Sequence, residues 1–181
     1  MAGSESAKAE LLRSFGEEVD SHRPRVTVVG IGNLLLRDEG VGVHLIQRLA
    51  EKMSNPNVSL IDGGTTPDVL SLVDGNVDKL IVVDAAVVGD QPGAIYRFNV
   101  EDLDSASPAP VSLHEMGVVD SLKLMTAFGN RPKKVTIFGI EPKVIDYGLE
   151  LSPELEETMP RLIELVLEEI TETNNSMEVA R

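Results

Sequence analysis

The hydrophobic residues of this chain fall into two kinds of pattern, which alternate from residue 26 onward. Short runs of consecutive apolar residues, rich in Val and Ile, are typical of buried strands. The run at 80–83 shows no alternation with polar residues, so we expect that strand to be covered on both faces. Strands are predicted at 26–32, 58–61, 80–83 and 135–140.

Apolar residues that recur every three or four positions predict helices between and after these strands. The clearest case runs over 41–53. The last helix is expected to begin at Ser152, because Ser followed by Pro is typical of a helix start, and to reach about residue 170. Two further helices are predicted, one from residue 65 or 66 to about 73, and one from residue 112 until Arg131 and Pro132 break it.

The segment 94–100 differs from the other strands, because apolar and polar residues alternate along it. It follows the strand at 80–83 after too few residues for a helical crossover, so we expect it to pair antiparallel. Strands that alternate with helices are typical of α/β proteins. The sequence therefore predicts an α/β fold, a three-layer open twisted sheet of about five mostly parallel strands with helices on both faces and one antiparallel edge strand.

The chain has 181 residues, which is one domain's worth of sequence. We expect a single α/β domain over residues 25–173, in a protein that is monomeric. Residues 1–24 are predicted to be an N-terminal extension, and residues 174–181 a frayed C-terminal tail.

Composition and charge exclude several classes of function. The net charge of -14 disfavours nucleic acid and anionic membrane surfaces as partners. The chain contains no cysteine, which excludes disulfides, thiolate metal sites, iron–sulfur clusters and Cys nucleophiles. No apolar run is long enough to span a membrane, and the acidic first residues do not resemble an export signal, so we expect a cytoplasmic protein.

Residues with metal-binding capacity follow the ends of two predicted strands. In open α/β sheets, binding sites form beyond the carboxyl ends of the strands, where the strand order reverses. The first strand leads to Glu39, the third ends at Asp84, and His114 opens a helix that can reach the same edge. These side chains form an oxygen and nitrogen ligand set for a divalent transition metal. Taken singly, each also has a structural explanation, as a helix-dipole partner, a turn residue or a helix cap.

Other sites find less support in the sequence. Gly30 and Gly32 after the first strand, with Asp62 after the second, match part of a dinucleotide-binding pattern. The third glycine of that pattern would fall at Leu35, and nearby carboxylates would repel a pyrophosphate. A nucleophilic triad lacks both a Cys and a Gly-x-Ser-x-Gly motif. We expect His44, on the first long helix, to be exposed to solvent.

Several linked motifs together resemble those of the nickel–iron hydrogenase maturation endopeptidases. They occur in the family's order, between about Arg25 and about Ile170. The longest contains both glycines after the first strand and the adjacent acids that follow them. The motifs are GIGNLLLRDEGVGV at 30–43, DGGT at 62–65, VDA at 83–85, SLHEMG at 112–117, FGIEP at 138–142 and YGLELS at 147–152.

The resemblance implies a single α/β domain and an endopeptidase of aspartic type. Such an enzyme removes a short C-terminal extension from the large-subunit precursor of a nickel–iron hydrogenase after nickel insertion. The nickel contacts that it implies are Glu39, Asp84 and His114, the three residues that the strand-end argument selects. In this mechanism the precursor carries the nickel, which serves as a recognition element, and the protease needs no permanently bound metal. The same metal can also act as a Lewis acid.

Within that hypothesis, Asp38 acts as the catalytic base or orients the attacking water. Gly63, Gly64 and Thr65 are expected to line the cleft for the extended peptide, although a plain strand-to-helix turn explains the glycines equally well. Two alternatives stay open. One is a nickel chaperone for hydrogenase that cuts nothing, and the other is a nucleotide-binding α/β enzyme.

Overall fold

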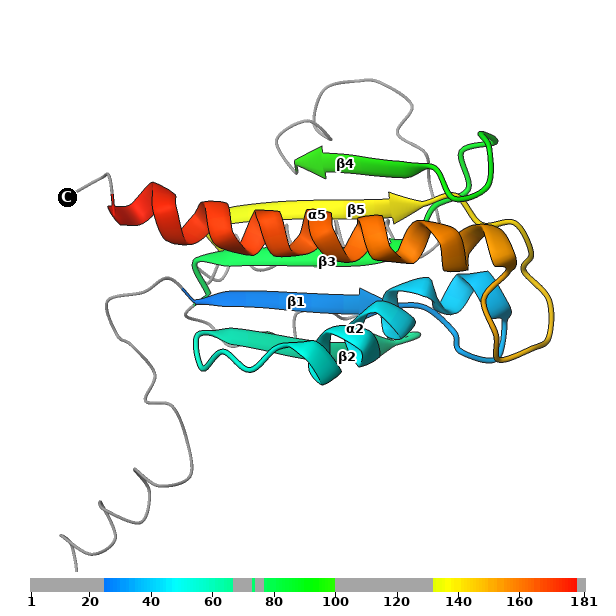
Figure 1. Cartoon of the computed structure of the whole chain (residues 1–181), viewed down its shortest axis with the longest axis horizontal. Helices are drawn as coiled ribbons and strands as arrows, with labels where there is room; N and C mark the ends of the chain where they lie inside the picture. The colour runs from blue at the N-terminus through cyan, green and yellow to red at the C-terminus, as the bar shows by residue number, and fades with distance from the viewer. Residues whose placement is uncertain (1–24, 67–72, 74–76, 100–131, 179–181) are drawn as a thin grey trace, which may run out of the picture.

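A computed structural model describes residues 25–66, 73, 77–99 and 132–178 of the chain. Its centre is a five-stranded sheet with the strand order β2-β1-β3-β5-β4 (Figure 1). Four strands run parallel, and β4 pairs antiparallel with β5 at one edge, so the predicted fold class is confirmed. The strands are β1 (Val26–Ile31), β2 (Val58–Gly64), β3 (Lys79–Ala85), β4 (Ile95–Asn99) and β5 (Lys134–Ile140).

Two helices, α2 (Val41–Lys52) and α5 (Pro153–Glu178), lie on the same face of the sheet (Figure 1). A short 3-10 turn, η1 (Arg37–Gly40), links β1 to α2. The helices predicted from residues 65 or 66 and from residue 112 fall mainly or wholly outside the described residues. None of the described helices is both long enough and apolar enough to cross a membrane.

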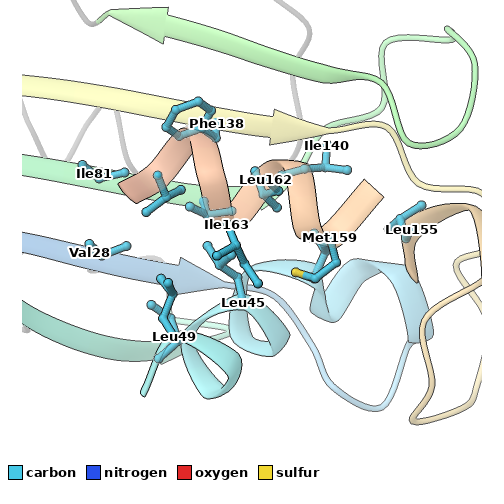
Figure 2. Close-up of a cluster of buried hydrophobic side chains, with 14 of the residues drawn as sticks. Val28, Leu45, Leu49, Ile81, Phe138, Ile140, Leu155, Met159, Leu162 and Ile163 are labelled. Carbon is cyan, nitrogen blue, oxygen red and sulfur yellow. The ribbon is translucent and has the colours of Figure 1, made fainter. Parts of the chain in front are cut away.

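Both faces of β1, β3 and β5 are buried, which explains why the apolar residues of these strands are consecutive rather than alternating. Figure 2 shows the face that packs against α2 and α5, where Val28, Ile81 and Phe138 project from three neighbouring strands. On the opposite face, Leu80 and Val82 belong to a second buried cluster. The helix residues in the first cluster include Leu45, Leu49, Leu155, Met159, Leu162 and Ile163.

The last helix begins close to the predicted start and runs further than expected. Its first residue is Pro153, and helical backbone continues to Glu178. We expected fraying from residue 174. The stretch from Thr171 onward contains no Gly or Pro before the helix ends, so no residue there breaks the helical hydrogen-bond ladder.

A buried group of charges joins α5 to the sheet. The carboxylate of Glu169 accepts hydrogen bonds from Lys79 Nζ, from Thr136 Oγ1 at 3.2 Å, and from Nε and Nη2 of Arg97 at 2.9 Å each. Burial by itself raises the pKa of Glu169, but the bonds from Arg97 and Lys79 outweigh it and lower the pKa from 4.5 to about 2. The glutamate therefore stays ionised at neutral pH, and charge-assisted hydrogen bonds hold the helix against β3, β4 and β5.

Three glycines allow the end of β1 to lie directly against the turn and helix that follow it. A Cβ on Gly30 would lie 2.0 Å from the carbonyl oxygen of Gly42, and a Cβ on Gly32 would lie 1.8 Å from that of Glu39. A Cβ on Gly42 would lie 2.2 Å from the carbonyl oxygen of Val83 in β3. Close packing of backbone against backbone thus accounts for the Gly30 and Gly32 pair without a bound dinucleotide.

Replacing Gly42 by alanine is expected to destabilise the protein by at least about 2 kcal/mol, because overpacking against backbone forces α2 away from the sheet. The added methyl group would also lie 2.4 Å from the carbonyl oxygen of Ile31. Urea denaturation of Gly42→Ala measures the loss, with Gln47→Ala, an exposed position on the same helix, as the matched control. Equal stabilities of the two variants would contradict this contact.

Candidate functional site

The carboxyl ends of β1 and β3 lie side by side where the strand order reverses. β2, which follows β1 in the sequence, pairs on one side of β1, and β3, the next strand, pairs on the other side. Open α/β sheets bind ligands at such a point. The turn η1, which follows β1, packs against β3. The structure thus confirms that the first and third predicted strands are neighbours, as the site prediction requires.

Glu39 lies in η1 at this carboxyl edge. Its main-chain N–H donates to the carbonyl oxygen of Leu36 at 3.2 Å, and its own carbonyl oxygen lies against Gly32. The side chain is half-buried, and its Oε2 atom is shielded from solvent with no hydrogen-bond partner in the described part of the chain. Because an unpaired buried carboxylate oxygen costs free energy, such an atom is typical of a group that receives a ligand. A carboxylate suits a divalent metal.

Asp84 reaches the same edge of the sheet from a different strand. It is the penultimate residue of β3, and only 1% of its surface is exposed. Its Oδ1 accepts a hydrogen bond from the N–H of Ala85 at 2.8 Å. The end of β3 thus places this buried carboxylate beside the turn that carries Glu39.

His114, the third predicted metal ligand, lies outside the described residues. Within the ranges that the structure does describe, no group of three or more His, Cys, Asp or Glu side chains is arranged to hold a metal ion. Two of the three predicted ligands thus share the carboxyl edge, and the complete ligand set stays a prediction.

Asp38 has an environment opposite to that of its neighbour Glu39. Its side chain is completely buried. Its Oδ2 accepts the main-chain N–H groups of Lys143 and Val144, both at 2.9 Å, and its Oδ1 accepts that of Ser152 at 2.7 Å. These bonds fasten residues 141–152, the connecting segment between β5 and α5, to η1. The predicted catalytic role of Asp38 is not tested by this geometry alone and stays a prediction.

Gly63, Gly64 and Thr65 lie at the carboxyl end of β2, next to β1. The carbonyl oxygen of Gly64 accepts a hydrogen bond from the N–H of Gly32 at 2.8 Å. The N–H of Gly64 donates to Asp62 Oδ1 at 2.9 Å. Gly64 has a positive φ of 52°, which glycine adopts readily, and Thr65 is exposed. The structure therefore brings these residues to the predicted edge, and it also gives the glycines a role in the turn.

His44 is less exposed than its place on the helix predicts. We expected an exposed side chain, but the ring is half-buried, and its Nε2 is covered without a hydrogen-bond partner among the described residues. The main chain of Leu149 hydrogen-bonds to the ring. Burial and the charge of Arg48 lower the pKa of His44, which keeps the ring neutral at pH 7. His44 lies three residues after Val41, so it is next to the apolar face of the helix. This spacing indicates partial burial.

Large apolar side chains are exposed on the connecting segment 141–152 and on the stretch before η1 that pairs with it. The N–H of Gly148 donates to the carbonyl oxygen of Leu35 at 3.0 Å, so the two stretches lie side by side. Exposed apolar side chains that gather in one place are typical of interaction surfaces. The members of this apolar rim are Leu35, Ile145, Tyr147 and Leu149.

Comparison with known proteins identifies relatives of this chain. Residues 43–169 match a protein family described as HycI, hydrogenase maturation protease. The hydrogenase 2 maturation protease of Escherichia coli strain K12 is 32% identical over 151 residues, which cover 82% of this chain and 92% of that protein. A putative hydrogenase maturation protease of Methanocaldococcus jannaschii is also 32% identical over 151 residues, covering 80% and 96%.

Solved structures of similar proteins share the fold. The hydrogenase maturating endopeptidase HybD from Escherichia coli superposes with a TM-score of 0.71 at 30% identity, covering 82% of this chain and 93% of that one. HybD from Thermococcus kodakarensis, a nickel–iron hydrogenase maturation protease, gives a TM-score of 0.67 at 30% identity, covering 80% and 97%. The sequence match, the extent of coverage and the shared architecture agree, and the chain belongs to the hydrogenase maturation protease family.

Proposed function

We propose that this protein is an endopeptidase that removes the C-terminal extension of a nickel–iron hydrogenase large-subunit precursor after nickel has been inserted. Membership of the family supports the protease activity and the class of substrate. The structural observation that carries the proposal is Oε2 of Glu39, which is buried and unpaired within the described part of the chain. A carboxylate kept without a partner at the carboxyl edge is suited to a positively charged ligand that arrives with the substrate.

Glu39, Asp84 and His114 are the proposed contacts to this nickel. Two carboxylates and an imidazole supply oxygen and nitrogen ligands, which suit a divalent transition metal and leave coordination positions to the precursor. The nickel belongs to the substrate, so the protease needs no resident metal. A precursor without nickel lacks this anchor and escapes cleavage. Bound nickel also lowers the pKa of a coordinated water or polarises the scissile carbonyl.

The precursor is proposed to lie across the carboxyl ends of β1 and β2. Gly64 has no side chain to obstruct an extended peptide, and a Cβ there would meet no atom within 4 Å, whereas the neighbouring Gly63 is buried against β1. Thr65 is exposed beside them. The apolar rim would meet the body of the precursor, because an apolar surface next to a cleavage site suits a protein substrate.

The protein is further proposed to be a monomer, to be an endopeptidase of aspartic type and to act in the cytoplasm. The chain contains no cysteine, so a Cys nucleophile is excluded. Cleavage then depends on an attacking water rather than on a covalent enzyme intermediate.

Mass spectrometry of a nickel-loaded large-subunit precursor, incubated with and without this protein, tests the proposal. We expect the nickel-loaded precursor to lose one C-terminal peptide and the metal-free precursor to keep its mass. Loss of the peptide from both forms would contradict recognition of nickel. An unchanged mass with transfer of nickel to the precursor would instead favour a nickel chaperone, and protection of the protease from unfolding by a nucleotide would favour a nucleotide-binding enzyme.

A further inference from the structure

We propose that Asp38 is a positioning residue and not a proton acceptor. In this proposal its buried carboxylate holds the connecting segment 141–152 against η1, and through η1 it sets the position of Glu39 at the carboxyl edge. The inference rests on the proposed function, in which Glu39 contacts the nickel of the precursor. It assigns different tasks to two adjacent carboxylates of the same turn.

The first observation is that both oxygens of Asp38 are already engaged. Three main-chain N–H groups, from Lys143, Val144 and Ser152, donate to them over 2.7 to 2.9 Å. The side chain has no exposed surface, so bulk water does not reach it. A catalytic base must contact the proton that it removes, either directly or through one water. The contacts of Asp38 instead satisfy buried main-chain donors, which would otherwise be left unpaired.

The second observation is that these bonds join parts of the chain that are far apart in sequence. They span 105, 106 and 114 residues. The N–H of Asp38 itself donates to the carbonyl oxygen of Val144 at 3.3 Å, which adds a link between the same two stretches. Asp38 therefore meets the connecting segment at both of its ends, near Lys143 and at Ser152.

The third observation is the backbone of the residue before Asp38. Arg37 has a φ of 51°, in the left-handed region that side chains other than glycine rarely adopt. Its N–H donates to the carbonyl oxygen of Gly148 at 3.0 Å, and its Nε lies 3.5 Å from the carbonyl oxygen of Tyr147, which accepts from it. A strained residue persists only where its surroundings over-determine the conformation. The connecting segment supplies those surroundings, and so it holds η1 in place.

Glu39 follows Asp38 directly within this turn. Any shift of Asp38 relative to the connecting segment moves the main chain of Glu39, whose Oε2 atom has no hydrogen bond among the described residues to hold it in place. Catalytic geometry tolerates little displacement, since a misplacement of about 1 Å costs roughly a hundredfold in rate. Asp38 thus affects cleavage through Glu39, without touching the substrate.

The test compares Asp38→Asn with Asp38→Ala in the full-length protein, with nickel-loaded precursor as substrate. An asparagine keeps one acceptor oxygen, which can still receive the N–H groups of Lys143 and Val144, while its NH2 group faces the N–H of Ser152 and cannot accept from it. We expect Asp38→Asn to lower kcat/KM about tenfold, as for one lost hydrogen bond to a charged group, and Asp38→Ala to lower it at least about a hundredfold. A base role predicts that both variants are equally inactive, because neither side chain takes up a proton. Asp146→Asn is the matched control, since Asp146 is an exposed aspartate of the same segment.

Amide hydrogen exchange supplies a second readout that does not depend on cleavage. Faster exchange at Lys143, Val144 and Ser152 is expected in Asp38→Ala, with protection in β1 and β3 unchanged. Wild-type activity in Asp38→Ala would overturn the proposal, and so would equal inactivity of both variants with unchanged exchange. If the wild-type protein itself fails to cut the precursor, the proposed function is refuted, and the exchange result alone decides whether Asp38 holds the segment.

Discussion

Processing of the nickel-loaded precursor is expected to fall at least about a hundredfold when Glu39 is replaced by alanine, since the precursor loses a contact that positions it. Oε2 of Glu39 is buried and has no hydrogen-bond partner in the described ranges, so in the proposed complex it can bind the substrate's metal without first breaking another bond. Mass spectrometry of the precursor over a time course measures this loss. Glu39→Gln is expected to be similarly impaired, because an amide oxygen carries no negative charge for the nickel.

Glu39→Ala is expected to leave the stability of the protein unchanged or slightly higher. Removing a side chain destabilises a fold when it leaves a buried partner unsatisfied. Oε2 of Glu39 has no such partner among the described residues. The burial of this oxygen destabilises the folded state, because no hydrogen bond compensates for the lost hydration. Functional sites often lower stability in this way. Urea denaturation of Glu39→Ala beside the wild type measures the difference.

Glu51→Ala is the matched control, because Glu51 is an exposed glutamate near the end of α2. It is expected to process the precursor at the wild-type rate. Full activity of Glu39→Ala would refute the assignment of this residue as a nickel contact. A large loss of stability in Glu39→Ala would show that the carboxylate has a structural partner.

The largest expected effect on stability comes from Glu169→Gln. Glu169 is 6% exposed, and its carboxylate bonds to Arg97 and to Lys79, which is itself buried. The neutral amide would leave the ammonium group of Lys79 buried without its counter-charge. Breaking a buried ion pair from one side costs about 3–5 kcal/mol. Urea denaturation at pH 7 is expected to show a loss of this size.

The contribution of Glu169 is expected to depend on pH in a defined direction. Its pKa is lowered from 4.5 to about 2 in the folded protein. A carboxylate with a lowered pKa stabilises the fold fully above the pKa of the unfolded chain, and this stabilisation is lost as the pH falls through the folded pKa. The shift corresponds to about 3 kcal/mol. The difference in stability between wild type and Glu169→Gln should therefore be largest above pH 4.5 and shrink towards pH 2.

Glu168→Gln is the control for this measurement, since Glu168 is an exposed neighbour on α5 that pairs with the exposed Arg161 at 3.5 Å. An exposed pair of this kind contributes less than about 1 kcal/mol. A pH-independent difference between wild type and Glu169→Gln would contradict the ion cluster. Processing by Glu169→Gln is expected to persist wherever the variant is folded, because Lys79 begins β3 and lies at the amino end of the strand, opposite to Asp84.

The fold was predictable because its signals are local. Consecutive apolar residues predicted the parallel strands, and the two clusters that bury both faces of β3 explain this pattern. The antiparallel edge strand followed from a connection too short for a helix. His44 was misplaced, because its exposure depends on the connecting segment that covers it, about a hundred residues further along the chain. The ion cluster around Glu169 was missed for the same reason, since its members come from α5 and three strands.

The sequence by itself determined the order of strands and helices, the family motifs, and the gathering of Glu39 and Asp84 at one edge of the sheet. Periodicity and turn residues act over a few neighbouring positions, so these features can be inferred from the chain alone. The tertiary structure alone decided what each of two adjacent carboxylates contacts. Asp38 and Glu39 carry the same charge, and no local pattern distinguishes them. They differ because amides from residues 143, 144 and 152 engage both oxygens of Asp38 and leave Oε2 of Glu39 unpaired within the described residues.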